Sequence, residues 1–383
     1  MSNILERRPT AEGLDAEVNG MSITTVPPEM RVNLERRQVS AMLLLAALAV
    51  PHSAARAQLT ELPYLVSDFD WVDRARSRRV PARLYWPTAA TSGRSVPLVV
   101  FSHGIGGSRE GYSYLGRHWS ARGVASLHVQ HVGSDVELWR GNPFGLIGRL
   151  QAAAQEREAI ARAADVSFAL DRMLSDQTGS RGAAVNRQRV IAAGHSYGAN
   201  TTLLMAGAQV VRDGQTIDCQ DSRFSAAIVI SAPPFYGEAD LAAVMSTVAV
   251  PSIHVTATED MIEIPGYRSG VEDRLAIFDA IAYPHKLLAV FHGGSHSMFT
   301  DRPFTGGRSL NAKVKVATAD LALAFLALVF ERDGTALAQW QTEWQSILAR
   351  APRPDATPPM RMTDGAMLQP FPSDAAPSRQ GAT

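Results

Sequence analysis

The chain has 383 residues, of which 46% are hydrophobic and 19% are charged, a composition that supports a large buried core and excludes a disordered or low-complexity protein. Lys and Arg total 37 and Asp and Glu total 37, so no net charge favours DNA, RNA or an anionic membrane surface as a partner. The single cysteine, Cys219, excludes an intramolecular disulfide and a multi-thiolate zinc site.

The beginning of the chain has the pattern of an export signal. Two arginines precede an apolar run over residues 41–50, which is shorter than the roughly 20 residues that span a bilayer. Small residues at Ala55 and Ala57 then suit a signal peptidase. We expect residues 1–57 to be an N-terminal extension and signal peptide, cleaved after Ala57, and the mature protein to be periplasmic or secreted with no stable membrane span.

Two features of this N-terminal segment stay open. Arg36 and Arg37 resemble a twin-arginine export signal, but Ala41 and Met42 are not its usual flanking residues, so the translocon is not fixed. Because signal peptides begin shortly before their positive region, Met30 is an alternative to Met1 as the first residue.

The middle of the chain, residues 58–350, alternates between strand and helix patterns. Short apolar runs with β-branched residues predict buried strands at residues 97–103, 124–131, 189–194, 226–231, 251–256 and 286–291. Helical spacing predicts helices at residues 156–174, 317–331 and 335–349. This alternation predicts one α/β domain, a mostly parallel, doubly wound sheet flanked by helices. Residues 351–383 are rich in Pro, Ala, Ser and Asp without apolar periodicity, so we expect a flexible tail there.

In such a sheet, ligands bind at the carboxyl ends of the strands, and there the sequence carries a nucleophile motif. Ser196 stands between Gly194 and Gly198, directly after one predicted strand and before an apolar helical stretch. A serine in a G-x-S-x-G turn between strand and helix is the nucleophile elbow of α/β-hydrolases, in which the orienting acid and then the histidine follow along the chain. We therefore predict that Ser196 is a catalytic nucleophile.

Two later loops offer the acid and the base that a serine nucleophile requires. Glu259 and Asp260 follow one predicted strand, and we favour Asp260 because an apolar pair after it could bury the carboxylate, whereas Glu259 suits an exposed turn. His292 and His296 follow the last predicted strand, and we favour His296 because glycines between the two let the loop carry it over the strand ends. His292, at the strand edge, suits a packing or hydrogen-bonding role.

The loop after the first predicted strand suits an oxyanion hole. An attacked ester carbonyl becomes a negative oxygen that needs preorganised backbone N–H donors. One donor would be the N–H of Tyr197, immediately after the nucleophile, and the second the N–H of Ile105 in the Gly104–Gly107 loop. His103 is expected to hold this loop by hydrogen bonding.

Together, residues 101–112, 194–198 and 293–296 resemble the bacterial α/β-hydrolases known as predicted dienelactone hydrolases, which are similar to platelet-activating-factor acetylhydrolases. The resemblance covers roughly residues 68–330. It implies the α/β-hydrolase fold and a serine carboxylesterase with Ser196, Asp260 and His296 as triad and the amides of Ile105 and Tyr197 as oxyanion hole. Dienelactone hydrolases use a cysteine nucleophile where this chain has serine, so their name does not transfer to the substrate.

Residues 132–144 are too many for a simple strand-to-helix connection and predict a cap over the site. Trp139 and Phe144 could line a substrate pocket, or the loop could be packed by its own aromatics. His131 points to the same rim, where a substrate contact and a structural role are both open.

The leading hypothesis is a secreted serine carboxylic-ester hydrolase that forms an acyl-enzyme with short-chain or phospholipid-like esters. The alternatives are a polyester hydrolase of the cutinase kind and a non-catalytic binding protein on a hydrolase fold. Amide cleavage has little support, and a metal enzyme lacks an H-E-x-x-H spacing. We expect no cofactor and no metal, a small-molecule ester as the partner, and leave the oligomeric state open.

Overall fold

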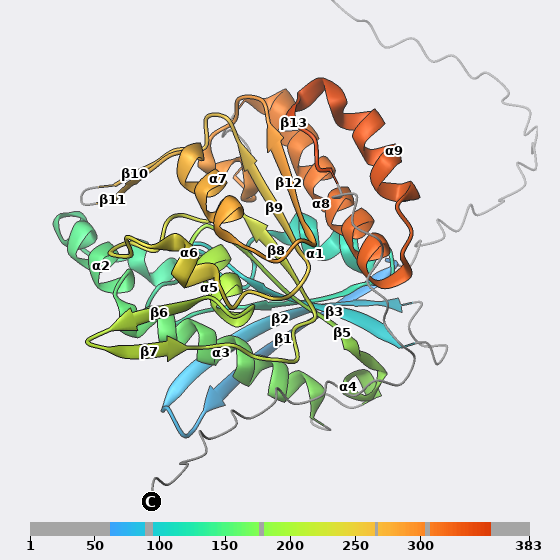
Figure 1. The fold of residues 1–383 in the computed structure, drawn as a ribbon. Helices are drawn as coiled ribbons and strands as arrows, with labels where there is room; N and C mark the ends of the chain where they lie inside the picture. The colour runs from blue at the N-terminus through green and yellow to red at the C-terminus, as the bar shows by residue number, and fades with distance from the viewer. Residues whose placement is uncertain (1–61, 89–94, 176–179, 265–266, 303–306, 354–383) are drawn as a thin grey trace, which may run out of the picture. The chain divides into compact units, whose positions relative to one another are not determined.

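Residues 62–88, 95–175, 180–264, 267–302 and 307–353, which the computed structural model describes, form a central sheet with helices on both faces (Figure 1). In sheet order the strands are β1 (Tyr64–Asp73), β2 (Arg78–Pro87), β4 (Ala125–Val129), β3 (Val96–Ser102), β5 (Val185–His195), β8 (Ala226–Ile230), β9 (Ser252–Ala257), β12 (Lys286–Phe291) and β13 (Leu348–Arg350). The pairings from β4 through β12 are parallel, while β1, β2 and β13 run antiparallel to their neighbours.

Helices and two small hairpins connect these strands. The helices are α1 (Ser113–Ser120), α2 (Leu146–Ala153), α3 (Glu156–Leu174), α4 (Ser180–Ala184), α5 (Tyr197–Met205), α6 (Leu241–Met245), α7 (Val271–Ala280), α8 (Arg308–Glu331) and α9 (Thr335–Trp344). Short 3₁₀ turns are η2 (Val136–Trp139), η3 (Pro143–Gly145), η5 (His296–Phe299) and η6 (Gln345–Ile347). The hairpins are β6–β7 (Gln209–Arg212 and Gln215–Asp218) and β10–β11 (Ile262–Ile264 and Tyr267–Ser269).

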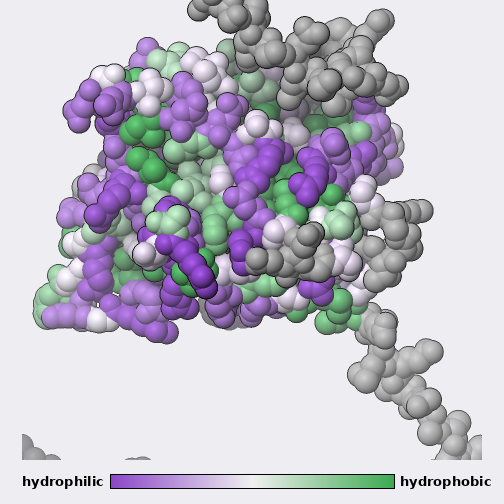
Figure 2. All heavy atoms as spheres, turned by 90° about the horizontal axis from the view of Figure 1, so that it is seen from below, coloured by the Kyte–Doolittle hydropathy of each residue, from purple (hydrophilic) through white to green (hydrophobic). Residues whose placement is uncertain are grey.

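The core lies on both faces of the sheet because successive strand residues point to opposite sides. In β3, Val99 and Phe101 belong to the cluster that includes buried residues of α1, α8 and α9. Leu98 and Val100 belong to the cluster with α3. The surface is more polar: on the face drawn in Figure 2, hydrophilic residues predominate and hydrophobic ones form smaller patches among them.

Helix α3 shows why a predicted element forms where it does. Its first turn carries Glu156 and Glu158 and its last turn Arg172, charges that complement the helix dipole. Val166, Leu170 and other residues at helical spacing are buried against the sheet. The observed bounds of α3 equal the predicted ones.

The sheet, with helices on both faces, confirms the predicted doubly wound α/β architecture. The largest differences from the predicted boundaries are in the last two helices. Helix α8 begins at Arg308 rather than at residue 317, and α9 ends at Trp344, followed by η6 and the edge strand β13. Strands β1 and β2 were not predicted. The expected signal peptide, residues 1–57, and residues 354–383 of the expected tail lie outside the described residues.

Candidate active site

Ser196 lies in a tight turn between β5 and α5, with φ 57° and ψ −126°, a backbone conformation that L-residues rarely adopt. The two glycines of the motif are sterically required. A Cβ atom on Gly194 would overlap the carbonyl of Gly198, and a Cβ atom on Gly198 would overlap the carbonyl of Ser102. The turn thus holds the serine at the carboxyl end of the central strand.

His296 bridges Ser196 and Asp260, and the three residues follow three different strands, β12, β5 and β9. Nε2 of His296 lies 2.8 Å from Oγ of Ser196, and Nδ1 lies 2.8 Å from Oδ1 of Asp260. Glu259 is exposed, as is His292. The structure therefore brings together the three side chains that the sequence singled out and leaves the two alternatives outside the cluster.

Asp260 is fully buried, yet its surroundings keep it ionised. Burial alone would raise the pKa of this carboxyl, but the hydrogen bond with His296 and the nearby charge of Arg274 hold the pKa well below its usual value. Thr256 donates its hydroxyl to Oδ2 at 2.7 Å, and Arg274 lies 3.5 Å from Oδ1. Ser231 Oγ lies 2.8 Å from Nδ1 of His296 and adds a polar contact at the same position. A fixed carboxylate here can orient the imidazole and stabilise its protonated form.

The loop after β3 lies against the serine, as an oxyanion hole requires. A Cβ atom on Gly104 would lie 3.1 Å from Cβ of Ser196. Ile105 is therefore the next residue after the point at which this loop approaches the serine. The loop is held by Gly106, whose N–H donates to the carbonyl of Ser134 at 2.8 Å. Trp139 donates its indole N–H to the carbonyl of Gly106 at 2.8 Å. The backbone of this loop thus approaches Ser196 at Gly104, the residue before Ile105.

Arg162 of α3 is a fully buried cation beneath this loop. Its guanidinium donates to the backbone carbonyl of His103, to Ser134 Oγ at 2.8 Å and to Thr201 Oγ1 at 3.1 Å. It also lies over the ring of Tyr197, 4.4 Å from the centroid. Burial lowers the pKa of Arg162 to about 10, which leaves the group charged at neutral pH. One side chain thus contacts both segments that would supply oxyanion donors.

Two buried histidines flank the nucleophile in neutral form. Burial lowers the pKa of His103 and that of His195 well below the usual value. His103 Nδ1 donates to the carbonyl of Gly104 at 2.7 Å, and its Nε2 accepts the N–H of His131 at 3.1 Å. His103 therefore holds the loop by hydrogen bonding, as expected from the sequence.

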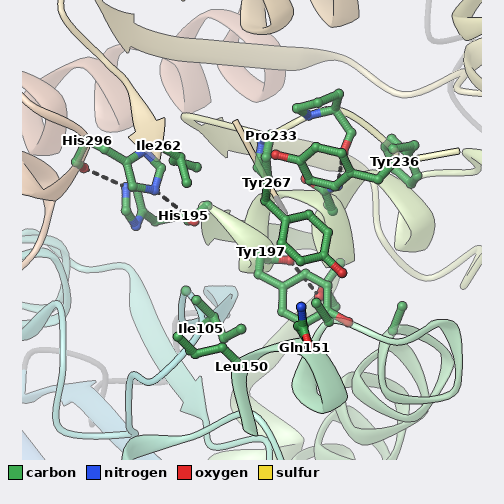
Figure 3. A pocket seen from close by; sticks show the side chains of 18 of the residues that line it. Ile105, Leu150, Gln151, His195, Tyr197, Pro233, Tyr236, Ile262, Tyr267 and His296 are labelled. Carbon is green, nitrogen blue, oxygen red and sulfur yellow. Dashed lines mark hydrogen bonds between the residues drawn. The ribbon is translucent and has the colours of Figure 1, made fainter. Parts of the chain in front are cut away.

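A cavity of about 500 Å³ opens beside Ser196 and His296. Figure 3 shows His296 and His195 on one side of it and the rings of Tyr197, Tyr236 and Tyr267 on the other. The Tyr236 and Tyr267 rings meet edge to face with centroids 4.9 Å apart. The walls of the cavity are mostly apolar.

The three residues proposed to bind substrate occupy different positions. Trp139 lines the cavity and is 45% exposed. Phe144 is 95% exposed and is not among the residues that line the cavity. His131 is fully buried, with Ser102 Oγ and Asp165 Oδ2 each 3.1 Å from its ring nitrogens, and does not line the cavity either. The physical reason is that His131, two residues after the end of β4, directs its ring at Asp165 of α3, whereas Phe144 lies in the exposed turn η3.

Three residues of the site were not predicted from the sequence: Ser231, Arg162 and Tyr112, whose hydroxyl lies 2.8 Å from Nδ1 of His195. Ser231 is the last residue of the predicted strand 226–231, and its hydroxyl at a strand end is a signal of the same kind as Asp260 and His296. Arg162 sits on a regular helix and Tyr112 in a loop, and no local pattern in the sequence marks either as part of a site.

The strand order, the strained serine between β5 and α5 and the hydrogen-bonded Ser196–His296–Asp260 cluster define a protein of the α/β-hydrolase fold. Residues 74–135 match the family model "Platelet-activating factor acetylhydrolase, isoform II", a segment that includes the Ile105 loop. The predicted resemblance to these acetylhydrolases is thereby confirmed.

Two known proteins are similar to the chain. Platelet-activating factor acetylhydrolase of Cavia porcellus is 24% identical over 311 residues, which are 71% of this chain and 64% of that protein's length. The chain thus spans less than two thirds of that relative. The solved structure of a ferulic acid esterase from Streptomyces cinnamoneus superposes with a TM-score of 0.49 and 19% identity, over 70% of this chain and 90% of the other.

Two features are absent from the described residues. None of their helices has both the length and the apolar character needed to cross a bilayer. Nor does that part of the chain hold a group of three or more His, Cys, Asp or Glu side chains placed to bind a metal ion.

Proposed function

We propose that the protein is a serine carboxylic-ester hydrolase that acts through an acyl-enzyme. The observation that carries this proposal is His296, whose two ring nitrogens lie 2.8 Å from Ser196 Oγ and 2.8 Å from Asp260 Oδ1. Nδ1–H directed at a carboxylate leaves Nε2 free to accept the serine proton, which is the arrangement that activates a hydroxyl nucleophile.

The reaction then follows from the positions of these groups. Ser196 Oγ attacks the ester carbonyl while its proton passes to Nε2 of His296. The negative oxygen is met by the N–H groups of Ile105 and Tyr197, and Asp260 stabilises the imidazolium. His296 then protonates the leaving alcohol, and water repeats the sequence to release the acid and regenerate the serine.

The similarity to acetylhydrolases supports short-chain or phospholipid-like esters as the substrate class. The polyester hydrolase and the non-catalytic binding protein remain the competing proposals. The geometry of Ser196 favours catalysis over binding alone. Its strained backbone conformation costs stability, and a protein that only binds a ligand has no need of that strain.

Labelling with a fluorophosphonate probe tests this function, since the probe reacts with an activated serine. We expect stoichiometric labelling of the wild-type protein and hydrolysis of p-nitrophenyl acetate, both lost in Ser196→Ala with the unfolding temperature unchanged. A wild-type protein that is folded but neither labelled nor active would leave the binding protein as the better proposal.

We further propose that the protein is exported, on the strength of the apolar run at residues 41–50 and the small residues before Gln58. Amino-terminal sequencing of the mature protein from its host should find Gln58 or a close neighbour. An active mature protein that begins at Met1 or Met30 would refute export by cleavage.

A further inference from the structure

The cavity continues beyond the reaction centre along one face of α5. Ser196, Asn200 and Leu204 all line it, and their spacing of four residues places them on the same side of the helix. At a rise of 1.5 Å per residue, the eight steps from Ser196 to Leu204 span about 12 Å. The cavity is therefore a groove rather than a pocket confined to the serine.

The far part of this groove is apolar. Leu204 is joined there by Ile160 of α3, Val210 of β6 and Ile217 of β7, all of which line the cavity. We call these four residues, with Asn200 nearer the serine, the α5 groove. Such a wall favours a hydrocarbon chain by about 0.8 kcal/mol for each methylene it removes from water.

The charges at the far end offset one another. Arg212 lines the cavity there, and its guanidinium pairs with Glu156 at 2.9 Å and also with Glu238. An anionic group at the end of a substrate chain would have to compete with these two carboxylates. The end of the groove thus suits a neutral chain terminus.

The position of His296 decides which half of an ester lies in the groove. His296 must protonate the departing alcohol, so the alcohol leaves on the side of its ring. Figure 3 shows Tyr197 and Tyr267 across the cavity from His296, and Tyr197 begins α5. The acyl substituent, which points away from the leaving group, is therefore directed toward the α5 groove.

We propose that the α5 groove is an acyl-chain subsite for an extended, uncharged aliphatic chain. With carbon–carbon bonds of about 1.5 Å, a span of 12 Å accommodates roughly nine or ten carbons in a zigzag chain. The inference rests on the proposed esterase function. The chain enters with the substrate, stays in the groove while its carbonyl carbon is bonded to Ser196 Oγ, and leaves as the free acid after water attacks.

The wild-type enzyme provides the first test, with p-nitrophenyl esters of two to twelve acyl carbons below their micelle concentrations. We expect kcat/KM to rise about fourfold per added methylene over part of the series and to stop rising near ten carbons. The same chain lengths placed in the alcohol half, as alkyl acetates, should give little change. A maximum at acetyl, or a length dependence in the alcohol series instead, would overturn the proposal.

Two substitutions fill the groove. Ile160, on α3, is 38% exposed and tolerates a larger side chain, and Ile217 is half-buried on β7. We expect Ile160→Trp and Ile217→Trp each to lower kcat/KM for the decanoyl ester about tenfold or more and to leave the acetyl ester within about twofold. Val211→Trp is the matched control, because Val211 is 58% exposed beside Val210 and does not line the cavity.

The outcomes separate the subsite from the chemistry. Fluorophosphonate labelling of Ser196 with a chain-length profile that both tryptophan variants leave unchanged refutes the α5 groove but not the esterase. Absence of labelling in the folded wild-type protein refutes the esterase itself. If Ile217→Trp does not fold, the more exposed Ile160→Trp decides the question.

Discussion

Nε2 of His195 lies 3.1 Å from the backbone carbonyl oxygen of His296, so the residue before the nucleophile holds the segment that carries the proposed base. A carbonyl accepts only, which places the hydrogen of His195 on Nε2 and leaves Nδ1 as an acceptor. Tyr112 donates to that Nδ1 at 2.8 Å and accepts the N–H of Gly104 at 3.2 Å. One hydrogen-bonded chain thus joins the proposed oxyanion loop to the base.

Removal of the Tyr112 hydroxyl should break this chain in the middle. We expect Tyr112→Phe to lower kcat about tenfold with KM little changed, because one lost hydrogen bond is worth roughly 1 kcal/mol or somewhat more and acts on positioning rather than on binding. Rates are normalised to serine titrated with fluorophosphonate. Tyr85→Phe, at another buried tyrosine, is the control. Wild-type kcat in Tyr112→Phe would show that the chain does not position the base.

The two histidines of one loop should differ in their importance. We expect His296→Ala to lower kcat by a factor on the order of a thousand or more, as the loss of a triad member does in serine hydrolases. The side chain of His292 is exposed, and its backbone N–H pairs with the carbonyl of Ile347. His292→Ala should therefore change neither turnover nor unfolding temperature. An inactive His292→Ala variant together with an active His296→Ala variant would show that His292, and not His296, is the base.

Asp260 and its neighbour form a second matched pair. Asp260→Asn keeps the shape but removes the charge that faces His296, so we expect kcat to fall on the order of a thousandfold. Glu259→Gln, at an exposed carboxylate, should stay near wild type. The measurement is kcat at neutral pH for both purified variants. Equal losses in the two would contradict the role of Asp260.

Ser196, Asp260 and His296 could be predicted because each lies in the loop or turn after an apolar strand, and a parallel sheet brings its strand ends to one edge. Arg162 and Tyr112 could not. Their contacts join residues far apart in the sequence, Arg162 to His103 and Tyr112 to His195, and such distances leave no local periodicity. His292, expected to pack or to hydrogen-bond at the strand edge, instead has its side chain exposed.

Two of the strands that the sequence pattern did not predict, β1 and β2, were obscured for the same physical reason. β1 and β2 form an antiparallel pair at the edge of the sheet, and residues of β1 alternate between partly buried and exposed positions. Charged residues therefore interrupt the apolar pattern. Pro81 also stands inside β2, and a proline within a run of residues argues against a strand there. The carbonyl of Pro81 nevertheless accepts the N–H of Gln130.

Arg162 should act through the segments it holds. We expect Arg162→Met to lower kcat/KM about a hundredfold, since the carbonyl of His103 and the ring of Tyr197 lose their shared partner. A trifluoromethyl ketone, whose adduct with Ser196 places an oxyanion on the same donors, should lose affinity in parallel. Arg157→Met, at an exposed arginine of the same helix, is the control. Unchanged inhibitor affinity together with reduced stability would make Arg162 a purely structural residue.

Acid should unfold the protein well above the pKa range of its carboxylates. Among the described residues five histidines are buried, and burial lowers the pKa of each: His103, His128, His131, His195 and His254. The pKa falls to about 4 for His128 and to about 3 for His254. Between those values and about 6.5 the unfolded chain binds protons that the folded chain does not. The free energy of unfolding therefore has its full value above about pH 6.5 and declines as the pH falls below it.

Each such histidine contributes a slope of up to about 1.4 kcal/mol per pH unit. His254, 3.2 Å from Ser252 Oγ and packed on Phe278, does not line the cavity and offers a test that leaves the site intact. We expect His254→Gln to reduce the slope by one proton, measured by urea unfolding of the wild-type protein and the variant from about pH 7.5 to 5. A free energy of unfolding that is constant over this range would contradict the assignment, because it would require the buried histidines to be protonated in the folded protein as readily as in the unfolded chain.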